Sequence, residues 1–168
     1  MSKRTSKPLK EKRLPVFGVG PIYVITCLLL TILAVFLHYK GHLTQWQMSG
    51  GKILSIILGS LSILLAVWLW IQSVIVQNIS KEIKQGKLVT TGVYGIVRNP
   101  IYSAFLFLFT GVLILLRNWL VLILPFVFWA LLSLLMKCTE ERWLKEKFGD
   151  EYIEYSKEVN RVIPWFRK

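Results

Sequence analysis

The sequence predicts an all-α polytopic membrane protein, with about four transmembrane helices, a helical hairpin and a C-terminal amphipathic cytoplasmic helix. Three observations support this fold class. Apolar residues make up 54% of the 168 residues, more than is usual in soluble domains. Long apolar runs without any charge recur at 16–37, 53–76, 101–116 and 119–136. Basic residues are concentrated on alternate connections between these runs.

The first two apolar runs are long enough to cross a bilayer, which takes roughly 20 residues. The last two are shorter and are separated only by Arg117 and Asn118, so they predict a tight helical hairpin. We do not expect the first run to be a cleaved signal peptide, because its apolar core is too long and no small-residue cleavage site follows. Along the second predicted span, Gly51, Ser55 and Gly59 recur every four residues and share one helix face, which favours close helix packing.

The basic residues predict the orientation in the membrane. Six lie in the tail 1–15, four in the loop 77–100 and eight after the fourth run, against three on the two opposite connections. The positive-inside rule therefore predicts cytoplasmic termini. We expect an integral membrane protein, in the plasma membrane of a prokaryote, with one membrane domain over 16–168. The net charge of +12 is attributed to this topology, and nucleic acid is not an expected partner because no recognition motif is present.

After the fourth run, 139–148 is expected to continue the helix out of the membrane. Gly149 is then expected to end that helix and Asp150 to cap the next one. An apolar stripe at helical spacing follows this segment, with charges on the other face. The stripe consists of Leu144, Phe148, Tyr152, Tyr155 and Val159. By itself the stripe indicates a helix lying on a surface, either bilayer or protein.

A polar, glycine-containing segment precedes the third run and ends in Arg98, Asn99 and Pro100. Glu140 and Glu141 lie where the fourth run leaves the bilayer, where carboxylates are costly unless paired or used. Because the hairpin makes these two runs antiparallel neighbours, we expect Arg98 to face the glutamate pair. Residue types alone leave open whether this is a structural clasp or a ligand site.

The predicted helix start favours a ligand site. Pro100 suits the first helical position, Asn99 is a good capping residue, and the free amides of the first turn attract a carboxylate. Arg98 adds charge-assisted hydrogen bonds, and the glutamates suit an ammonium group or ribose hydroxyls. S-adenosylmethionine is a zwitterion with a ribose and uses both kinds of group. His38 and His42 have metal-ligand spacing but no third ligand nearby, so no metal is expected.

Over residues 86–166 the chain resembles the isoprenylcysteine carboxyl methyltransferase and phospholipid methyltransferase superfamily of integral membrane enzymes. The matching residues, in the family's order and spacing, are Leu88-Val89-Thr90-Thr91-Gly92-Val93-Tyr94, Arg98-Asn99-Pro100-Ile101-Tyr102, Glu140-Glu141, Leu144, Phe148-Gly149-Asp150-Glu151-Tyr152, Tyr155, Arg161 and Ile163-Pro164. The resemblance implies an S-adenosylmethionine pocket formed by the last two spans and the C-terminal segment. It also implies a tunnel from that pocket to the lipid and methyl transfer to a lipid-associated acceptor at the cytoplasmic face.

The resemblance also assigns roles to residues of this chain. Arg98 and Glu141 are the expected catalytic pair, acting by binding rather than as acid and base. The expected cofactor contacts are Val97, Arg98, Asn99, Pro100, Tyr102, Glu140, Glu141, Phe148 and Tyr152. The acceptor contacts are inferred from the residues instead: the short third and fourth runs, the small Ala104 and Gly111 and the apolar Phe105 and Leu108 suggest a lateral gap beside the hairpin. The expected acceptor contacts there are Ser103, Ala104, Phe105 and Leu108.

Two departures and two alternatives accompany these assignments. The family commonly has histidine where this chain has Asn99, which cannot titrate near neutral pH, so an acid–base role is not expected there. Ala104 stands where the family often has glycine, and it is still small. The alternatives to an isoprenylcysteine carboxyl methyltransferase-like enzyme are a phospholipid N-methyltransferase and a non-enzymatic scaffold that has kept the fold.

Overall fold

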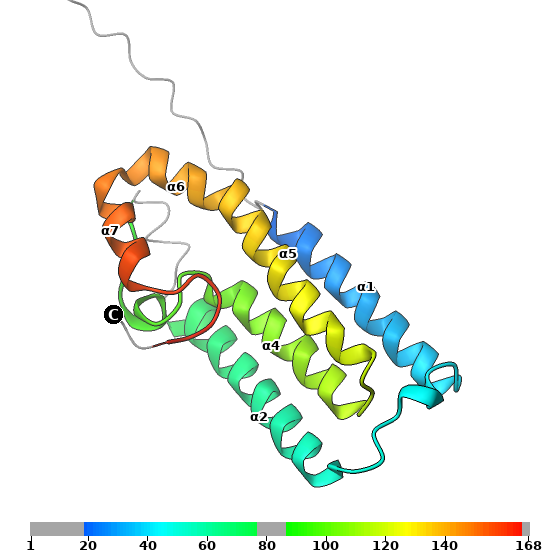
Figure 1. Cartoon of the computed structure of the whole chain (residues 1–168). Helices are drawn as coiled ribbons and strands as arrows, with labels where there is room; N and C mark the ends of the chain where they lie inside the picture. Colours follow the sequence, from blue (N-terminus) through cyan, green and yellow to red (C-terminus); the bar gives the residue numbers. More distant parts are fainter. Residues whose placement is uncertain (1–18, 77–86, 166–168) are drawn as a thin grey trace, which may run out of the picture.

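A bundle of four apolar helices forms the body of the molecule, in a computed structural model that describes residues 19–76 and 87–165 (Figure 1). Its helices are α1 (Gly20–Tyr39), α2 (Lys52–Ile71, extended by a π-helical turn Gln72–Val76), α4 (Pro100–Leu115) and α5 (Leu124–Cys138). Two short helices follow, α6 (Glu140–Phe148) and α7 (Asp150–Glu158). Single 3₁₀ turns lie at Thr44–Trp46, Gly92–Gly95 and Val121–Ile123. The described residues contain no β-strand, in agreement with the all-α prediction.

Three of the helical segments are long and apolar enough to cross a membrane. They are Gly20–Tyr39, Lys52–Val74 and Val121–Phe148. The predicted third span, α4, has 16 residues, so it is about 24 Å long and shorter than the roughly 30 Å hydrocarbon core. The bundle therefore has two full-length apolar helices, α1 and α2, and the short helix α4. The fourth helix, α5, has 15 residues and reaches full length only together with the 3₁₀ turn before it and α6 after it. Large apolar side chains such as Ile22, Ile53 and Phe126 are exposed on its outside, as lipid-facing residues are.

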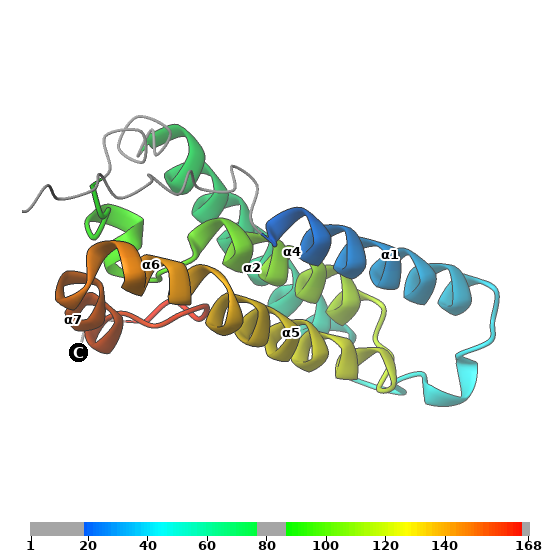
Figure 2. The same cartoon turned by 90° about the horizontal axis from the view of Figure 1, so that it is seen from above.

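The short helix α4 lies at the centre, with α2 on one side and α1 and α5 on the other (Figures 1 and 2). It crosses α2 at two glycines. A Cβ added at Gly111 would come 2.7 Å from the carbonyl oxygen of Gly59, and one at Gly59 would come 3.1 Å from the carbonyl oxygen of Gly111. Ser55 on the same face of α2 is buried. The prediction of close packing is confirmed for Ser55 and Gly59, because small residues let the backbones approach. It does not hold for Gly51, which is the exposed N-cap of α2 with no neighbouring atom within 4 Å of an added Cβ.

The predicted hairpin between the last two apolar runs is also confirmed. Arg117 takes a left-handed conformation, with φ of 53°, and reverses the chain after α4. Asn118 is fully buried, and its Oδ1 accepts hydrogen bonds from the backbone amides of Leu120 and Val121. Its amide nitrogen donates to the carbonyl oxygen of Leu43 at 2.8 Å, so the hairpin turn is fastened to the loop between α1 and α2.

The C-terminal helices differ from the prediction in two details. The helix does not continue through 139–148, because Thr139 leaves helical geometry at φ −124° and ψ −80° and separates α5 from α6. Gly149 ends α6 as predicted, with φ of 54°. The prediction that Asp150 caps α7 is wrong: Gly149 occupies the N-cap position and no side-chain cap bond forms there.

The apolar stripe of α6 and α7 packs on protein. Tyr152, Tyr155 and Val159 are buried together, and Leu88, Leu144 and Phe148 pack against them. The sequence did not decide whether the stripe lies on the bilayer or on protein, and this cluster shows that it packs on protein. The stripe thereby anchors α7 over the loop that leads into α4 and gathers the polar motifs at one end of the bundle (Figure 2).

Candidate functional site

The C-terminal segment after α7 runs beside the loop that precedes α4. Val97 and Asn160 form an isolated parallel β-bridge, and the amide of Arg98 donates to the carbonyl oxygen of Asn160 at 2.8 Å. Farther along, the amide of Trp165 donates to the carbonyl oxygen of Ile96 at 3.3 Å. Val97 itself is fully buried in an apolar cluster. This pairing sets Arg98 beside Arg161, although the two are far apart in sequence.

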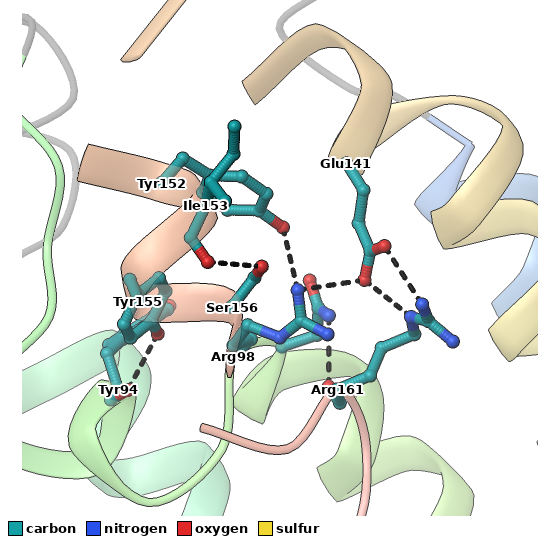
Figure 3. A network of polar contacts seen from close by, with 9 residues as sticks. Tyr94, Arg98, Glu141, Tyr152, Ile153, Tyr155, Ser156 and Arg161 are labelled. Atoms are coloured by element: carbon teal, nitrogen blue, oxygen red, sulfur yellow. Dashed lines mark hydrogen bonds and ion pairs between the residues drawn. The ribbon is translucent and has the colours of Figure 1, made fainter. Parts of the chain in front are cut away.

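Two arginines converge on one buried carboxylate in Figure 3. Arg98 Nη1 lies 3.2 Å from Glu141 Oε1. Arg161 binds the same carboxylate with two of its guanidinium nitrogens, Nε to Oε1 at 2.5 Å and Nη2 to Oε2 at 2.9 Å. Glu141 is only 5% exposed, so these charge-assisted bonds form largely out of water. The prediction that Arg98 faces the glutamates is confirmed for Glu141.

The charges of this cluster do not balance. Two guanidinium groups share one carboxylate, which leaves one excess positive charge shared by the nearly buried Arg98 and by Arg161, whose side chain is 28% exposed. Arg98 Nη1 also donates to the hydroxyl of Tyr152 at 3.1 Å, yet Arg98 Nε is buried and has no hydrogen-bond partner among the described residues. Buried polar groups normally have partners. An anionic ligand such as a carboxylate would satisfy both the unpaired Nε–H and the excess charge.

Burial and the cluster together fix the charge states of its neighbours. Burial raises the pKa of Tyr152, although the positive charge of Arg98 opposes the shift. Burial also raises the pKa of Tyr94, and the negative charge of Glu140 adds to this effect. The hydrogen bond to Glu141 raises the pKa of Arg161. Near neutral pH both tyrosines are therefore uncharged hydrogen-bonding groups, and Arg161 is a permanent cation.

Glu140 belongs to a second polar group, on the side of α1. The hydroxyl of Tyr102 donates to Glu140 Oε1 at 2.9 Å. The same tyrosine ring packs on the start of α1, where a Cβ added at Gly20 would come 2.5 Å from its hydroxyl oxygen. Only glycine therefore fits at that position without displacing Tyr102. The two adjacent glutamates thus separate, Glu141 towards the arginines and Glu140 towards Tyr102.

Asn99 occupies the N-cap position of α4, as predicted. Its side chain, however, makes no capping bond to the first turn. Instead its Nδ2 donates to the carbonyl oxygen of Arg161 at 3.0 Å. Pro100 is the first residue of the helix, as predicted. The carbonyl oxygen of Arg161, which accepts this bond, is 62 residues away from Asn99, so nothing in the local sequence indicated the contact.

Of the four predicted acceptor contacts, three lie together. Ala104, Phe105 and Leu108 line an apolar cavity of about 240 Å³ between α4 and α2. Ser103 is fully buried and lies elsewhere, because its hydroxyl donates to the carbonyl oxygen of Val162. Ser103 therefore holds the C-terminal segment against α4. Phe148, a predicted cofactor contact, packs in the apolar cluster of α7 instead of contacting the arginines directly.

Two residues of the site were not assigned from the sequence. Arg161 makes two bonds to Glu141, and in the sequence it stands out only as part of the matching C-terminal motif. Its place two residues before Ile163-Pro164 in that motif was the available signal. Gly20 precedes a proline at the start of an apolar run, a context that indicates a helix start and gives no sign of contact with Tyr102.

Comparison with known proteins identifies the family of this chain. The family model described as phospholipid methyltransferase matches residues 53–151, more than half of the chain. The protein therefore belongs to this family of methyltransferases, which agrees with the resemblance read from the motifs. The matched region contains α2, α4, α5 and the Glu141 end of the cluster, while α1 and Arg161 lie outside it.

Named relatives match about half of the chain. The protein-S-isoprenylcysteine O-methyltransferase of Schizosaccharomyces pombe is 40% identical over 86 residues, 51% of this chain and 36% of that protein. Protein-S-isoprenylcysteine O-methyltransferase B of Arabidopsis thaliana is 39% identical over 80 residues, 47% of this chain and 40% of that protein. Methanethiol S-methyltransferase 1 of Bradyrhizobium diazoefficiens is 30% identical over 89 residues, 53% of this chain and 30% of that protein. The matches thus span less than half of each relative's length.

Proposed function

We propose that this integral membrane protein transfers a methyl group from S-adenosylmethionine to a lipid-associated acceptor at the cytoplasmic membrane face, as an isoprenylcysteine carboxyl methyltransferase-like enzyme. The observation that carries the proposal is the buried cluster of Arg98, Glu141 and Arg161. Its excess positive charge lies at the start of α4, and the same helix lines the smaller apolar cavity. Membership of the family and the names of the relatives support the same chemistry.

The cofactor fits this cluster by charge and by hydrogen bonding. The unpaired Nε–H of Arg98 and the excess charge suit the carboxylate of S-adenosylmethionine, and a helix N-terminus such as that of α4 favours an anion. Tyr152 sits over Arg98, with the guanidinium carbon 5.9 Å from the ring centroid, and helps to exclude water. When bound, the cofactor supplies a methyl group already activated by its sulfonium, and the protein's part is alignment.

Glu141 acts in this proposal as a positioning residue. Its carboxylate is occupied by three bonds from two arginines, so it fixes the direction of the guanidinium groups. Asn99 assists by holding the backbone of Arg161, and Ser103 by holding the next residue. Val97 and Pro100 shape the wall beside Arg98 through burial. Glu140 and Tyr102 form the other polar wall, on the α1 side, and are proposed to receive the ammonium or hydroxyl groups of the cofactor.

The acceptor is proposed to approach along the cavity lined by Ala104, Phe105 and Leu108, with its polar end towards Tyr102. The relatives' names include both a prenylcysteine carboxylate and a thiol as acceptors. The family description favours a second candidate, a phospholipid N-methyltransferase. A carboxylate or thiolate needs no base in the site, whereas an amine must lose a proton, for which Glu140 is the available group. The non-enzymatic scaffold remains the alternative if the cluster is only a clasp.

Two measurements on the purified full chain test the proposal. Calorimetric titration with S-adenosylhomocysteine should show saturable binding, and its absence would leave only the scaffold. Uptake of labelled methyl should then be compared among an S-farnesylated cysteine, a phosphatidylethanolamine and a short-chain thiol. Preference for the farnesylated carboxylate supports the proposal, and preference for the phospholipid amine selects the second candidate. A preference for the water-soluble thiol would contradict a lipid-associated acceptor.

The cytoplasmic placement of the site rests on the distribution of basic residues. Of the 21 lysines and arginines, 18 lie on the predicted inner side, although many of these fall in 1–18, 77–86 and 166–168, outside the described residues. A reporter fused after residue 168 is expected to report a cytoplasmic location. An external signal from that reporter would invert the proposed orientation.

A further inference from the structure

A second, larger cavity lies between α1 and α4, away from the cluster of arginines. It measures about 730 Å³, within the roughly 300–1,000 Å³ usual for ligand sites. Its walls are Leu28, Ile32, Val35 and Phe36 of α1 and Phe109 and Val112 of α4. The hydroxyl of Thr31, which also lines the cavity, already donates to the carbonyl oxygen of Cys27 at 2.7 Å. The lining is therefore apolar from Leu28 to Phe36, and its remaining polar side chains, Tyr39 and Lys40, lie at one end.

The position of this groove along α1 matches one leaflet of a bilayer. It begins near the middle of α1, at Leu28, and ends at Lys40, just beyond the last helical residue. Twelve residues of helix rise about 18 Å. One leaflet contributes about 15 Å to the roughly 30 Å hydrocarbon core, so the groove spans one leaflet and reaches the start of the headgroup region. The site described above lies at the other end of α1. The groove consequently faces the leaflet opposite the site.

The mouth of the groove is basic. Segments 38–52 and 116–120 form this end of the molecule and contain no aspartate or glutamate. Arg117 is occupied, because its Nη2 donates to the carbonyl oxygens of Met48 and Gly50. Lys40 makes no ion pair with the described residues, and its Nζ lies 5.7 Å from the centre of the Phe36 ring, at the groove. The groove is thus one leaflet deep, and Lys40 at its end is a cation that a ligand can use.

We propose that this groove binds an anionic phospholipid of the opposite leaflet, with an acyl chain between α1 and α4 and the phosphate at Lys40. A second copy of the chain fits less well in the same orientation, because this end offers no carboxylate to meet Lys40. The lipid would fill the space between α1 and α4 and so fasten α1, whose first residue packs on Tyr102. The inference depends on membrane insertion and is independent of the proposed methyl transfer.

The test uses the full chain in neutral detergent, titrated with phosphatidylglycerol or with phosphatidylcholine of the same acyl chains. Binding is followed by native mass spectrometry and by the melting temperature. Phosphatidylglycerol should bind more tightly, and Lys40→Gln should weaken it about fivefold, which corresponds to about 1 kcal/mol for one interfacial lysine. Lys52→Gln is the matched control, since it removes the same charge from the same end but away from the groove, and should change the affinity less than twofold.

Filling the groove provides the second arm. Val112→Phe should weaken both lipids, with helical content unchanged by circular dichroism. If that variant does not fold, Ile32→Trp replaces it, because Ile32 is 55% exposed and tolerates a larger side chain. Equal affinity for the two lipids, equal effects of the two lysine variants, or a dimer that forms without added lipid and is lost in Val112→Phe would each overturn the proposal.

Discussion

Replacing Arg98 with lysine separates a ligand site from a structural clasp. Arg98 is nearly buried, and its side chain is 9% exposed. Its Nη1 serves both Glu141, at 3.2 Å, and Tyr152, at 3.1 Å, while its Nε has no partner among the described residues. Lysine keeps the charge but lacks the fork of the guanidinium, so it can hold Glu141 and loses the donor that is available to a ligand.

The expected magnitudes differ for folding and for binding. Glu141 keeps both bonds from Arg161 in this variant, so the loss in the free energy of unfolding should be about 1 kcal/mol, the net contribution of one hydrogen bond. A lost charge-assisted bond to the cofactor carboxylate is expected to cost about 1.5–3 kcal/mol of binding. That cost corresponds to a rise in the Kd for S-adenosylhomocysteine of roughly 10- to 150-fold.

Calorimetric titration gives the Kd, and thermal unfolding in the same detergent gives the change in stability. Arg142→Lys is the matched control, because Arg142 is exposed on the same α6 helix that carries Glu141. Its Kd and melting temperature should both stay at the wild-type values. If Arg98→Lys lowers the melting temperature while the Kd is unchanged, the cluster is a clasp and the assignment of the cofactor site is wrong.

Three further predictions concern packing and the acceptor. Gly111→Ala should lower the free energy of unfolding by about 1–3 kcal/mol, measured by thermal unfolding, because the added Cβ would overlap α2. Gly50→Ala is the control and should leave the melting temperature unchanged, because nothing lies within 4 Å of its added Cβ. Tyr155→Phe removes the 2.6 Å hydrogen bond to the carbonyl oxygen of Tyr94 and should lower the free energy of unfolding by about 1–3 kcal/mol. Amide hydrogen exchange in the loop before α4 should become faster. Unchanged exchange would show that other contacts hold the loop. Ala104→Leu, which narrows the smaller cavity, should raise the KM for a lipid acceptor and leave the Kd for S-adenosylhomocysteine unchanged. Parallel losses of both would place Ala104 in the cofactor pocket.

The spans could be predicted because their signals are local. Continuous apolar runs, the short Arg117-Asn118 interruption and the small residues of α2 each depend on a few neighbouring residues. Pro100 and Gly149 likewise fix a helix start and a helix end through their own backbone preferences. The break at Thr139 could not be predicted in this way, because the side chains around it read as continuous helix and the turn is set by where α6 packs.

The sequence by itself determined the apolar helices, the hairpin and the motif that resembles the methyltransferase superfamily, including the approach of Arg98 to a glutamate. Only the tertiary structure decided how the polar groups pair. It assigned Glu141 to the two arginines and Glu140 to Tyr102, turned Asn99 away from its cap and brought Arg161 into the site. The physical reason is that each of these side chains has several possible partners of similar strength. The choice among them depends on the pairing of 96–98 with the C-terminal segment, two stretches that are brought together by the packing of α6 and α7 and not by any local signal.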